Sequence, residues 1–319
     1  MSASAERPIG VFYEHPDWFR PLFAELDRRG TPYVRERADQ HRFDPGEAPP
    51  YSLVFNRMSP SAWLRGRGDA IFYTLQYLAY LKARGVRVVN GYDAFVTETS
   101  KLQQLALLQE LGLSFPWAQV IHDGTQAPAA AAGLRFPVVV KPNIGGSGAG
   151  IMRFDRPESL ERAALAGELE LGIDGTALVQ EFIPTADGSI VRVEVLGGRF
   201  LYAIRVFSSG ESFNLCPADI CRTTDGVELA RAACPVDAPA NGLRVEGYAP
   251  PPRQIAEVEQ IARAAGIEVG GVEYLVDARD GRLCYYDINA LSNFVADAPR
   301  VIGFDPFARL ADYLEREAA

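Results

Sequence analysis

The chain has 319 residues, of which 48% are hydrophobic and 23% charged, and its formal net charge is −9 at pH 7. This length exceeds that of a usual single core, so we expect two or three compact units that share interfaces. An acidic chain is poorly suited to nonspecific nucleic-acid binding, and no stretch approaches the roughly eighteen uninterrupted apolar residues of a membrane helix. The first residues lack a signal-peptide core, so we expect a cytoplasmic protein without nucleic-acid or membrane partners.

Cysteine and histidine are both scarce. The chain has four cysteines and three histidines, and no histidine lies near a cysteine in the sequence. Cys216 and Cys221 are separated by four residues, which is not a zinc-site spacing. Zinc sites and Cys-His or Ser-His catalysis are therefore set aside.

The first 95 residues alternate between short apolar runs and helical patterns. The pattern predicts a small, largely parallel α/β domain, whose ligands would lie at the carboxyl ends of its strands. Arg57 follows the third strand and suits a contact with a substrate anion, although a plain surface arginine is equally consistent with the pattern. The expected strands are 8–13, 33–35, 51–55 and 86–89, and the expected helices are 16–29 and 69–84.

Lysine is rare, since only Lys82, Lys101 and Lys141 among 32 basic residues are not arginine. Lys141 follows a short apolar strand, 136–140, and precedes a glycine-rich turn, 145–150, after which a strand resumes at Ile151. Glycines let backbone N–H groups crowd around anionic oxygens, and a lysine adds a compact charge. The segment therefore predicts a phosphate grip; the alternative is an ordinary hairpin with a solvated lysine.

Lys101 lies in the first turn of a helix expected over 100–111. A cation near the positive end of a helix is unfavourable by a few tenths of a kcal/mol, so a bound anion would compensate for it. Solvation of the ammonium would serve as well.

The last third of the chain reads as strands 179–183, 190–196 and 200–206, a helix over 254–265, and a final strand pair 271–277 and 282–289. Residues 207–253 form an irregular stretch that includes Arg222, Arg231 and Arg244. We expect part of this stretch to border an acceptor pocket, and a solvated loop is the alternative.

The final strand pair carries Glu273 on one strand and Asp287 and Asn289 on the other. Residues directly opposite each other point to the same side, so Glu273 can face Asp287 only if the connecting loop has an odd number of residues. A three-residue loop, 279–281, with its glycine left-handed meets this condition. Two carboxylates and an amide oxygen would then converge as a set suited to Mg²⁺; a solvated polar face is the alternative.

Four features occur in an order that resembles the ATP-grasp superfamily: Lys101, the run KPNIGGSGAGI, the segment VQEFIP and the closing YYDIN. The compact N-terminal domain and the run IVRVEVLGGRFLYAIRV are most similar to RimK-type ligases, relatives of glutathione synthetase that join a carboxylate to an amine. The resemblance implies an α/β and α+β architecture of three parts: an N-terminal parallel α/β domain, 1–95, a central lid subdomain, 96–180, and a C-terminal antiparallel-sheet subdomain with the metal site, 181–319.

The resemblance also implies roles for particular positions. Lys101 and Lys141 would contact nucleotide phosphates, the glycine turn would be a mobile lid, and the segment 180–183 would hold adenine. The nucleotide-binding positions implied are Lys101, Lys141, Gly145, Gly146, Ser147, Gly148, Gln180, Glu181, Phe182 and Ile183. The metal ligands implied are Glu273, Asp287 and Asn289, for one or two Mg²⁺ ions or for Mn²⁺.

The implied reaction is ATP-dependent. A substrate carboxylate would attack the γ-phosphorus to give an acyl phosphate, and an amine would then displace phosphate. Arg205 is the candidate stabiliser of the oxyanion, with a strand-borne salt bridge as its alternative, and Lys141 would assist phosphoryl transfer. Arg192 and Asn214 are further candidates for contacts to substrate, phosphate or metal.

Two departures from the family pattern bear on this implication. The usual Glu-x-Asn metal motif is Asp287-Ile288-Asn289 here, and the shorter aspartate weakens the case for a second metal. The family's acidic residue two positions before Arg192 is replaced by Ile190, and Asp187 is the candidate substitute.

The expected activity is therefore that of a ligase acting on small-molecule carboxylate and amine substrates. An ATP-grasp kinase and a nucleotide-binding protein without turnover are the alternatives. A homo-oligomer is left open.

Overall fold

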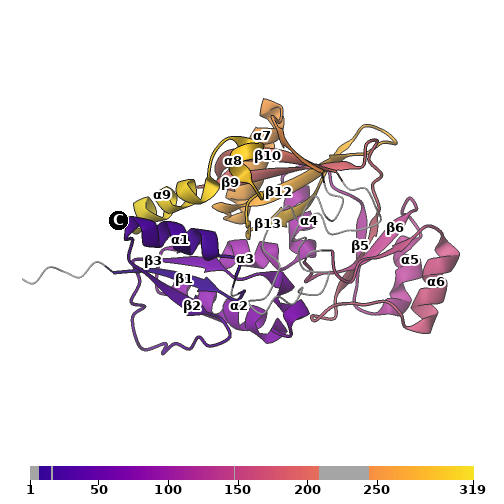
Figure 1. The fold of residues 1–319 in the computed structure, drawn as a ribbon. Helices are drawn as coiled ribbons and strands as arrows, with labels where there is room; N and C mark the ends of the chain where they lie inside the picture. The colour runs from indigo at the N-terminus through magenta and orange to yellow at the C-terminus, as the bar shows by residue number, and fades with distance from the viewer. Residues whose placement is uncertain (1–6, 16, 147, 208–243) are drawn as a thin grey trace, which may run out of the picture.

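The computed structural model describes the chain except for residues 1–6, 16, 147 and 208–243. Three sheets account for its strands, and they follow one another along the chain in three units (Figure 1). Asn214, Ser147, Arg222 and Arg231 lie outside the described residues. Among the described residues, no helix combines the length and apolar character needed to cross a membrane.

The N-terminal unit is a four-stranded, fully parallel sheet in the order β2-β1-β3-β4, as the sequence predicts. The strand that carries Arg57 extends two residues further than expected, so this arginine is the last strand residue and is buried. The elements are β1 Ile9–Tyr13, α1 Arg20–Arg29, β2 Tyr33–Arg37, β3 Leu53–Arg57, η1 Pro60–Arg65, α2 Gly68–Ala83, β4 Val88–Val89 and α3 Tyr92–Glu98.

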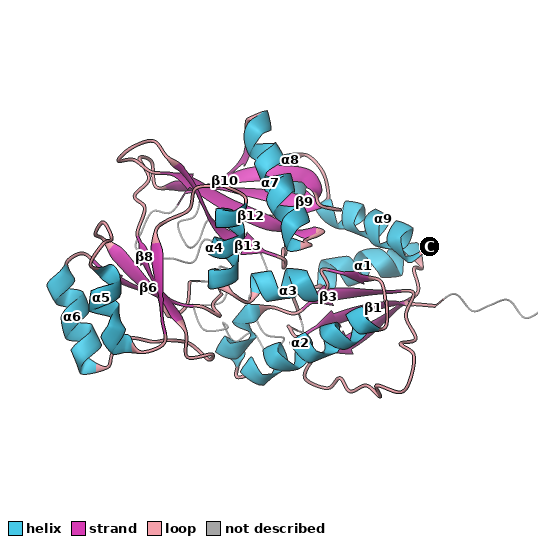
Figure 2. Ribbon diagram, turned by 180° about the vertical axis from the view of Figure 1, so that it is seen from behind, coloured by secondary structure: helices cyan, strands magenta, loops and turns pink. Residues whose placement is uncertain are grey.

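The central unit is a four-stranded sheet in the order β5-β8-β6-β7, and α5 and α6 pack together beside it (Figure 2). Its core is its own, formed by residues between Ile121 and Val179. The elements are β5 Ala118–Ile121, η2 Gly124–Gln126, α5 Ala127–Ala131, β6 Val138–Pro142, β7 Met152–Phe154, α6 Pro157–Ala166 and β8 Ala177–Glu181.

The C-terminal unit is a five-stranded antiparallel sheet in the order β11-β10-β9-β12-β13. The stretch expected to be irregular contains one strand of this sheet, β11, which begins at Arg244. The elements are β9 Ser189–Leu196, β10 Arg199–Phe207, β11 Arg244–Tyr248, α7 Pro252–Ala265, β12 Val269–Val276, β13 Leu283–Asn289, α8 Ala298–Ile302 and α9 Pro306–Ala318.

Two helices tie the units together. Helix α4, Lys101–Glu110, follows the N-terminal unit in sequence, but its apolar side packs with α7 and the C-terminal sheet. Helix α9 runs beside α1, and one apolar core is shared between the N-terminal and C-terminal units (Figure 1). The N-terminal end of α4 is therefore anchored to the C-terminal unit.

The last hairpin corrects the expected three-residue loop. Asp277 and Arg282 are joined by a backbone hydrogen bond of 2.9 Å, so four residues connect them, and Gly281 is left-handed at φ 74°. The four-residue connection alone would put Glu273 and Asp287 out of register. A bulge at Tyr286 shifts the register by one residue, and Glu273 pairs with Asp287 after all.

Gly270 in β12 is where the hairpin is packed most tightly. A Cβ at this position would lie 2.2 Å from the backbone oxygen of Asn289 and 2.8 Å from the Cγ2 of Ile267. Gly270→Ala should therefore lower the free energy of unfolding by about 3 kcal/mol or more, since the nearest atom belongs to the backbone. Chemical denaturation followed by circular dichroism measures this loss.

Gly133→Ala is the matched control, because a Cβ there meets nothing within 4 Å and the glycine φ is not left-handed. Its unfolding free energy should stay within about 0.5 kcal/mol of the parent. Equal stability of the two variants would contradict the packing of β12 against the end of β13.

Candidate functional site

Lys141 lies on β6 with a side chain that is buried, at 8% exposure. Burial and, second to it, the nearby Lys101 ammonium lower the pKa of Lys141 to about 7, although Asp287 acts in the opposite direction. The solvated lysine of an ordinary hairpin is therefore excluded. A buried ammonium with a second cation close by needs an anion.

Lys101 is the first residue of α4. Its ammonium is hydrogen-bonded to Asp287 at the far end of β13, although the two residues lie far apart in the sequence. The Ser100 hydroxyl caps the helix by accepting from the Gln103 N–H at 3.2 Å. The Lys101 ammonium is therefore not solvated but paired across two elements.

Asn143 joins the start of α4 to the end of β6. Its Oδ1 accepts from the Leu102 N–H and the Ser100 hydroxyl, each at 3.0 Å, and its amide nitrogen donates to Asp174 at 2.8 Å. The two lysines thus come from different units, but one buried amide fixes the spacing between them.

The glycine turn follows directly. Gly148 and Gly150 have φ values of 72° and 70°, the left-handed region that favours glycine. Gly146 lies against η1 of the N-terminal unit, since a Cβ there would be 2.7 Å from the Cβ of Ser61. The turn therefore lies between the central and N-terminal units, as a phosphate-binding turn would require.

The segment expected to hold adenine leaves the central sheet at the end of β8. Gln180 is buried, and its side-chain oxygen has no hydrogen-bond partner. The Glu181 side chain is engaged by Arg135, whose backbone N–H donates to it at 3.0 Å. Ile183 is buried, and Arg153 stacks on Phe182 at 4.4 Å. Glu181 therefore has little of its carboxylate left for a ligand.

The acidic pair of the last hairpin is divided between two environments. Glu273 accepts from Arg192 at 2.9 Å and from the Tyr286 hydroxyl at 2.5 Å, and burial raises its pKa although Arg192 opposes the shift. Burial alone would raise the pKa of Asp287, but the Lys101 ammonium holds it below its usual value. Asn289 donates to Asp287 at 3.0 Å.

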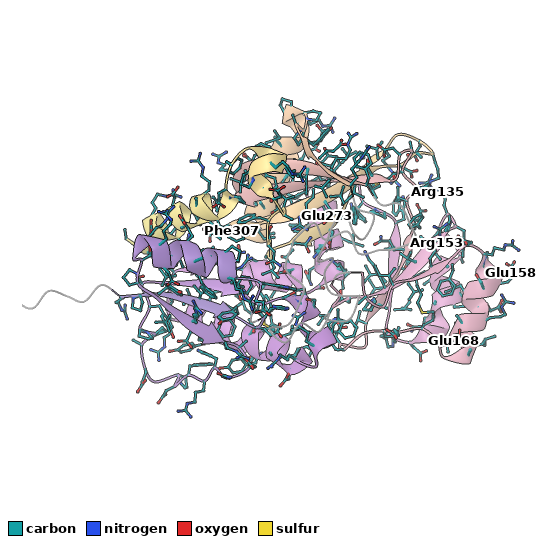
Figure 3. All side chains as sticks on the ribbon, in the orientation of Figure 1. Arg135, Arg153, Glu158, Glu168, Glu273 and Phe307 are labelled. Carbon is teal, nitrogen blue, oxygen red and sulfur yellow. The ribbon has the colours of Figure 1, made fainter. Side chains whose placement is uncertain are left out.

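Glu273 lies near the middle of the molecule, and Arg135 and Arg153 lie on the central unit (Figure 3).

The expected metal ligands are thus neighbours, but they are bound to protein donors. Within the described residues, no three His, Cys, Asp or Glu side chains are placed to hold a metal ion together. Asp287 with the amide oxygen of Asn289 is the part of the set that points to a hard cation. The metal site stays a prediction.

Two of the remaining arginines have partners. Arg192 lies between Glu194, at 2.6 Å, and Glu273. Arg205 is 3.8 Å from Asp187 and stacks on Tyr248, while its Nε has no partner. The salt-bridge alternative for Arg205 therefore describes one of its contacts, and the expected oxyanion role stays a prediction.

Arg57 is buried, at 2% exposure, where the N-terminal and C-terminal units meet. Its Nη2 donates to the backbone oxygen of Ser292 and, at 3.3 Å, to Asn293, both just past β13. Its Nε and Nη1 have no hydrogen-bond partner, and burial lowers its pKa to about 10. The surface-arginine alternative is wrong, because the loop after β13 folds over this side chain.

Sequence reasoning missed the neighbours of Arg57. Glu98, the last residue of α3, is buried, and burial raises its pKa to about 8, although Arg57 opposes the shift. His15 and Trp18 lie just past β1 and are also buried. The signal for them was their place after a parallel strand, the same signal that singled out Arg57.

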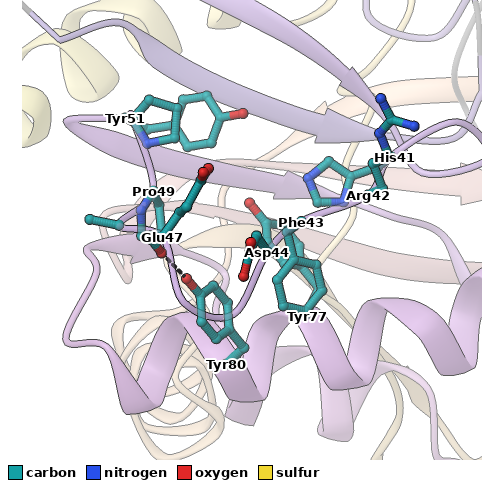
Figure 4. Close-up of a pocket in the computed structure, with 11 residues that line it drawn as sticks. His41, Arg42, Phe43, Asp44, Glu47, Pro49, Tyr51, Tyr77 and Tyr80 are labelled. Atoms are coloured by element: carbon teal, nitrogen blue, oxygen red, sulfur yellow. Dashed lines mark hydrogen bonds between the residues drawn. The ribbon is translucent and has the colours of Figure 1, made fainter.

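A separate pocket of about 430 Å³ lies in the N-terminal unit, between α2 and the chain that connects β2 to β3 (Figure 4). None of the predicted site residues lines it. Its lining residues are His41, Arg42, Phe43, Asp44, Glu47, Ala48, Pro49, Pro50, Tyr51, Tyr77 and Tyr80.

Comparison with known proteins agrees with this geometry. Residues 98–215 match the RimK-like ATP-grasp domain family. A probable alpha-L-glutamate ligase of Teredinibacter turnerae is 28% identical over 165 residues, which are 51% of each chain. The chain thus spans about half the length of the curated relatives it matches.

Solved structures cover almost the whole chain. D-cycloserine synthetase DcsG aligns with a TM-score of 0.67 at 16% identity, over 98% of this chain and 100% of that one. The ATP-grasp ligase PsnB, complexed with minimal precursor, Mg and ADP, aligns with a TM-score of 0.63 at 20% identity, over 98% and 97%. The chain therefore has the fold of these ATP-grasp ligases, and within it residues 98–215 match the RimK-like ATP-grasp domain family.

Proposed function

We propose that this protein is an ATP-dependent carboxylate–amine ligase that forms an amide bond through an acyl phosphate. The observation that carries the proposal is the junction of Lys101, Lys141 and Asp287, where the Lys101 ammonium is paired with Asp287 and the buried Lys141 lies close enough for both charges to act on its pKa. A nucleotide polyphosphate supplies the missing negative charge. The probable alpha-L-glutamate ligases and the PsnB complex with Mg and ADP support the same assignment.

The reaction requires positioning and charge neutralisation more than covalent help from the protein. Lys101 and Lys141 bind phosphate oxygens, and the backbone N–H groups of 145–150 close over them. The substrate carboxylate attacks the γ-phosphorus, and ADP leaves. The amine then attacks the acyl carbon and expels phosphate, so amide, ADP, phosphate and a proton are formed, with Arg205 beside the developing oxyanion.

Mg²⁺ is the cofactor that fits best. Asp287 offers carboxylate oxygens and Asn289 an amide oxygen, both hard donors, and Glu273 lies opposite on β12. When bound, the ion would neutralise phosphate charge. Asp287 would hold the ion in place of the Lys101 ammonium, which would then be available to bind phosphate.

The substrates that we propose are a small-molecule carboxylate and an amine in the cytoplasm. An ADP-forming ligase should, with ATP and Mg²⁺, convert a pool of amino acids and dipeptides into a product whose mass equals two substrates less water. We expect ADP and phosphate release to fall by at least about a hundredfold in Lys141→Ala, because the variant loses the buried positive charge that would contact the transferred phosphate. Mass spectrometry of the pools reads the product.

Lys82→Ala is the matched control, since Lys82 is exposed and paired with Asp93. It should ligate as the parent does. Phosphorylated substrate without condensation would identify a kinase instead, and ATP binding without turnover in any pool would argue for a nucleotide-binding protein that does not catalyse.

Nucleotide binding should also take up a proton at Lys141. With a pKa of about 7, this amine is mostly neutral at pH 8, and phosphate contact favours its charged form. We therefore expect uptake of about 0.9 proton at pH 8 and little at pH 6, because the folded, ligand-free amine is already protonated there. Calorimetric titration of ADP in two buffers of different ionisation enthalpy measures the uptake.

Lys141→Arg supplies the control, because arginine keeps its charge at pH 8. The variant should bind ADP without proton uptake. Equal uptake by the parent and Lys141→Arg would place the titrating group elsewhere.

A further inference from the structure

The carboxyl ends of β1 and β3 carry buried N–H groups that have no acceptor. Arg57 ends β3, and its Cα partner on β1 is Tyr13, so His15 and Trp18 follow from the same edge of the sheet. The atoms without a hydrogen-bond partner are the Nε and Nη1 of Arg57, the Nε2 of His15 and the Nε1 of Trp18. A buried donor left unpaired costs about 1–3 kcal/mol.

His15 is a donor at this atom rather than an acceptor. Its Nδ1 accepts from the backbone N–H of Asp17 at 3.2 Å, which leaves the ring proton on Nε2. Burial, with Arg65 and Arg20 nearby, lowers the pKa of His15 to about 3, so the ring is neutral at physiological pH. Two unpaired buried acceptors are found near these donors within the described residues: the Oδ2 of Asp17, and the Oε2 of Glu194, whose charge acts on Arg57.

The donors belong to one packed cluster. The His15 ring stacks on Trp18 at 4.3 Å with an interplanar angle of 6°, and the Arg65 guanidinium lies 5.0 Å from the Trp18 ring. Arg65 also donates to the hydroxyl of Ser61 at 3.2 Å. Arg57 lies 4.9 Å from the ring of Phe19, which follows Trp18.

This cluster borders the proposed reaction centre on two sides. Ser61, which Arg65 contacts, is the residue against which Gly146 of the glycine turn packs. Arg57 contacts the chain just past Asn289 through Ser292 and Asn293. The donors therefore lie between the proposed phosphate grip and the proposed metal end of β13.

We propose that His15, Trp18 and Arg57 form an oxyanion subsite that holds a carboxylate of the donor substrate. The inference rests on the proposed function only where it identifies the bound acid as the carboxylate substrate of the ligase. A planar carboxylate offers two oxygens with about four acceptor positions, which matches in number the four unpaired N–H donors at this edge of the sheet. The flat wall of His15 and Trp18 suits a planar group, and the guanidinium supplies the opposite charge. An uncharged amide would leave donors unpaired and bring N–H groups of its own.

The test measures acid binding without ATP. Calorimetry would titrate the parent with succinate, glutarate, glutamate and benzoate, each paired with its fully amidated analogue, and with sodium chloride as the salt control. We expect at least one acid to bind at least tenfold more tightly than its amide. Trp18 lies at the subsite, so the same acid should change tryptophan fluorescence.

Two variants remove donors while keeping shape. Arg57→Lys keeps the charge and loses the planar fork, and should weaken acid binding roughly tenfold to a hundredfold. Trp18→Phe keeps an aromatic ring against His15 and loses one N–H, and should weaken it about threefold to tenfold. Trp117→Phe is the matched control, because Trp117 is 58% exposed and precedes β5 in the central unit; acid binding should not change.

The outcomes separate this inference from the proposed function. If no acid binds more tightly than its amide, or if Arg57→Lys binds acid as the parent does, the subsite is refuted even where ligation is observed. If acids bind and the variants weaken them while ADP affinity is kept, the subsite stands even where no amide forms. In an active ligase, Arg57→Lys should raise the KM for the acid and leave that for ATP unchanged.

Discussion

The contact between Lys101 and Asp287 sets the charge of the whole junction. The partly buried Lys101 ammonium is paired with this carboxylate, and the buried Lys141 lies near both, whereas the nearby Glu273 is already held by Arg192 and Tyr286. Burial first, and the Lys101 charge second, lower the pKa of Lys141, so an anion bound there would favour its charged form. A polyphosphate answers the imbalance directly. The site is therefore preorganised to bind an anion.

The two lysines reach the junction from units with separate cores. Lys101 is the first residue of α4, which packs with α7 and the C-terminal sheet, whereas Lys141 belongs to the central sheet. Asn143 bridges them through the Ser100 hydroxyl and the Leu102 N–H. Any movement of the central unit against the C-terminal unit must therefore either keep these hydrogen bonds or separate the two charges. A phosphate bound by both lysines adds a third link across the same boundary.

The sequence predicted what depends on local pattern. The parallel N-terminal sheet, the strand before Lys141, the helix that carries Lys101 and the last strand pair all follow from periodicity and from glycine residues, although the cap of that helix is Ser100 rather than the expected Thr97 or Thr99. The pairing of Glu273 with Asp287 was reached for the wrong reason, because a four-residue connection and a bulge at Tyr286 replace the expected three-residue loop. A bulge is invisible in an alternation pattern, since it changes parity without changing composition. The burial of Arg57 and Glu98 was missed because it comes from packing between units.

The unpaired donors of Arg57, His15 and Trp18 show why binding and stability are opposed at this end of the site. Each buried N–H without an acceptor costs the free protein about 1–3 kcal/mol, and a mutation that removed the donor would recover part of that cost. The protein keeps these donors beside the phosphate grip. The carboxylates of Glu98 and Glu194 act on the pKa of Arg57, but its Nε and Nη1 have no hydrogen-bond partner. A carboxylate bound there pairs these donors and so removes their free-energy cost, which its amide cannot do. The preference for an acid over its amide then comes from the free-energy cost of unpaired donors that are already present in the ligand-free protein. The substrate is therefore selected before any step of the reaction.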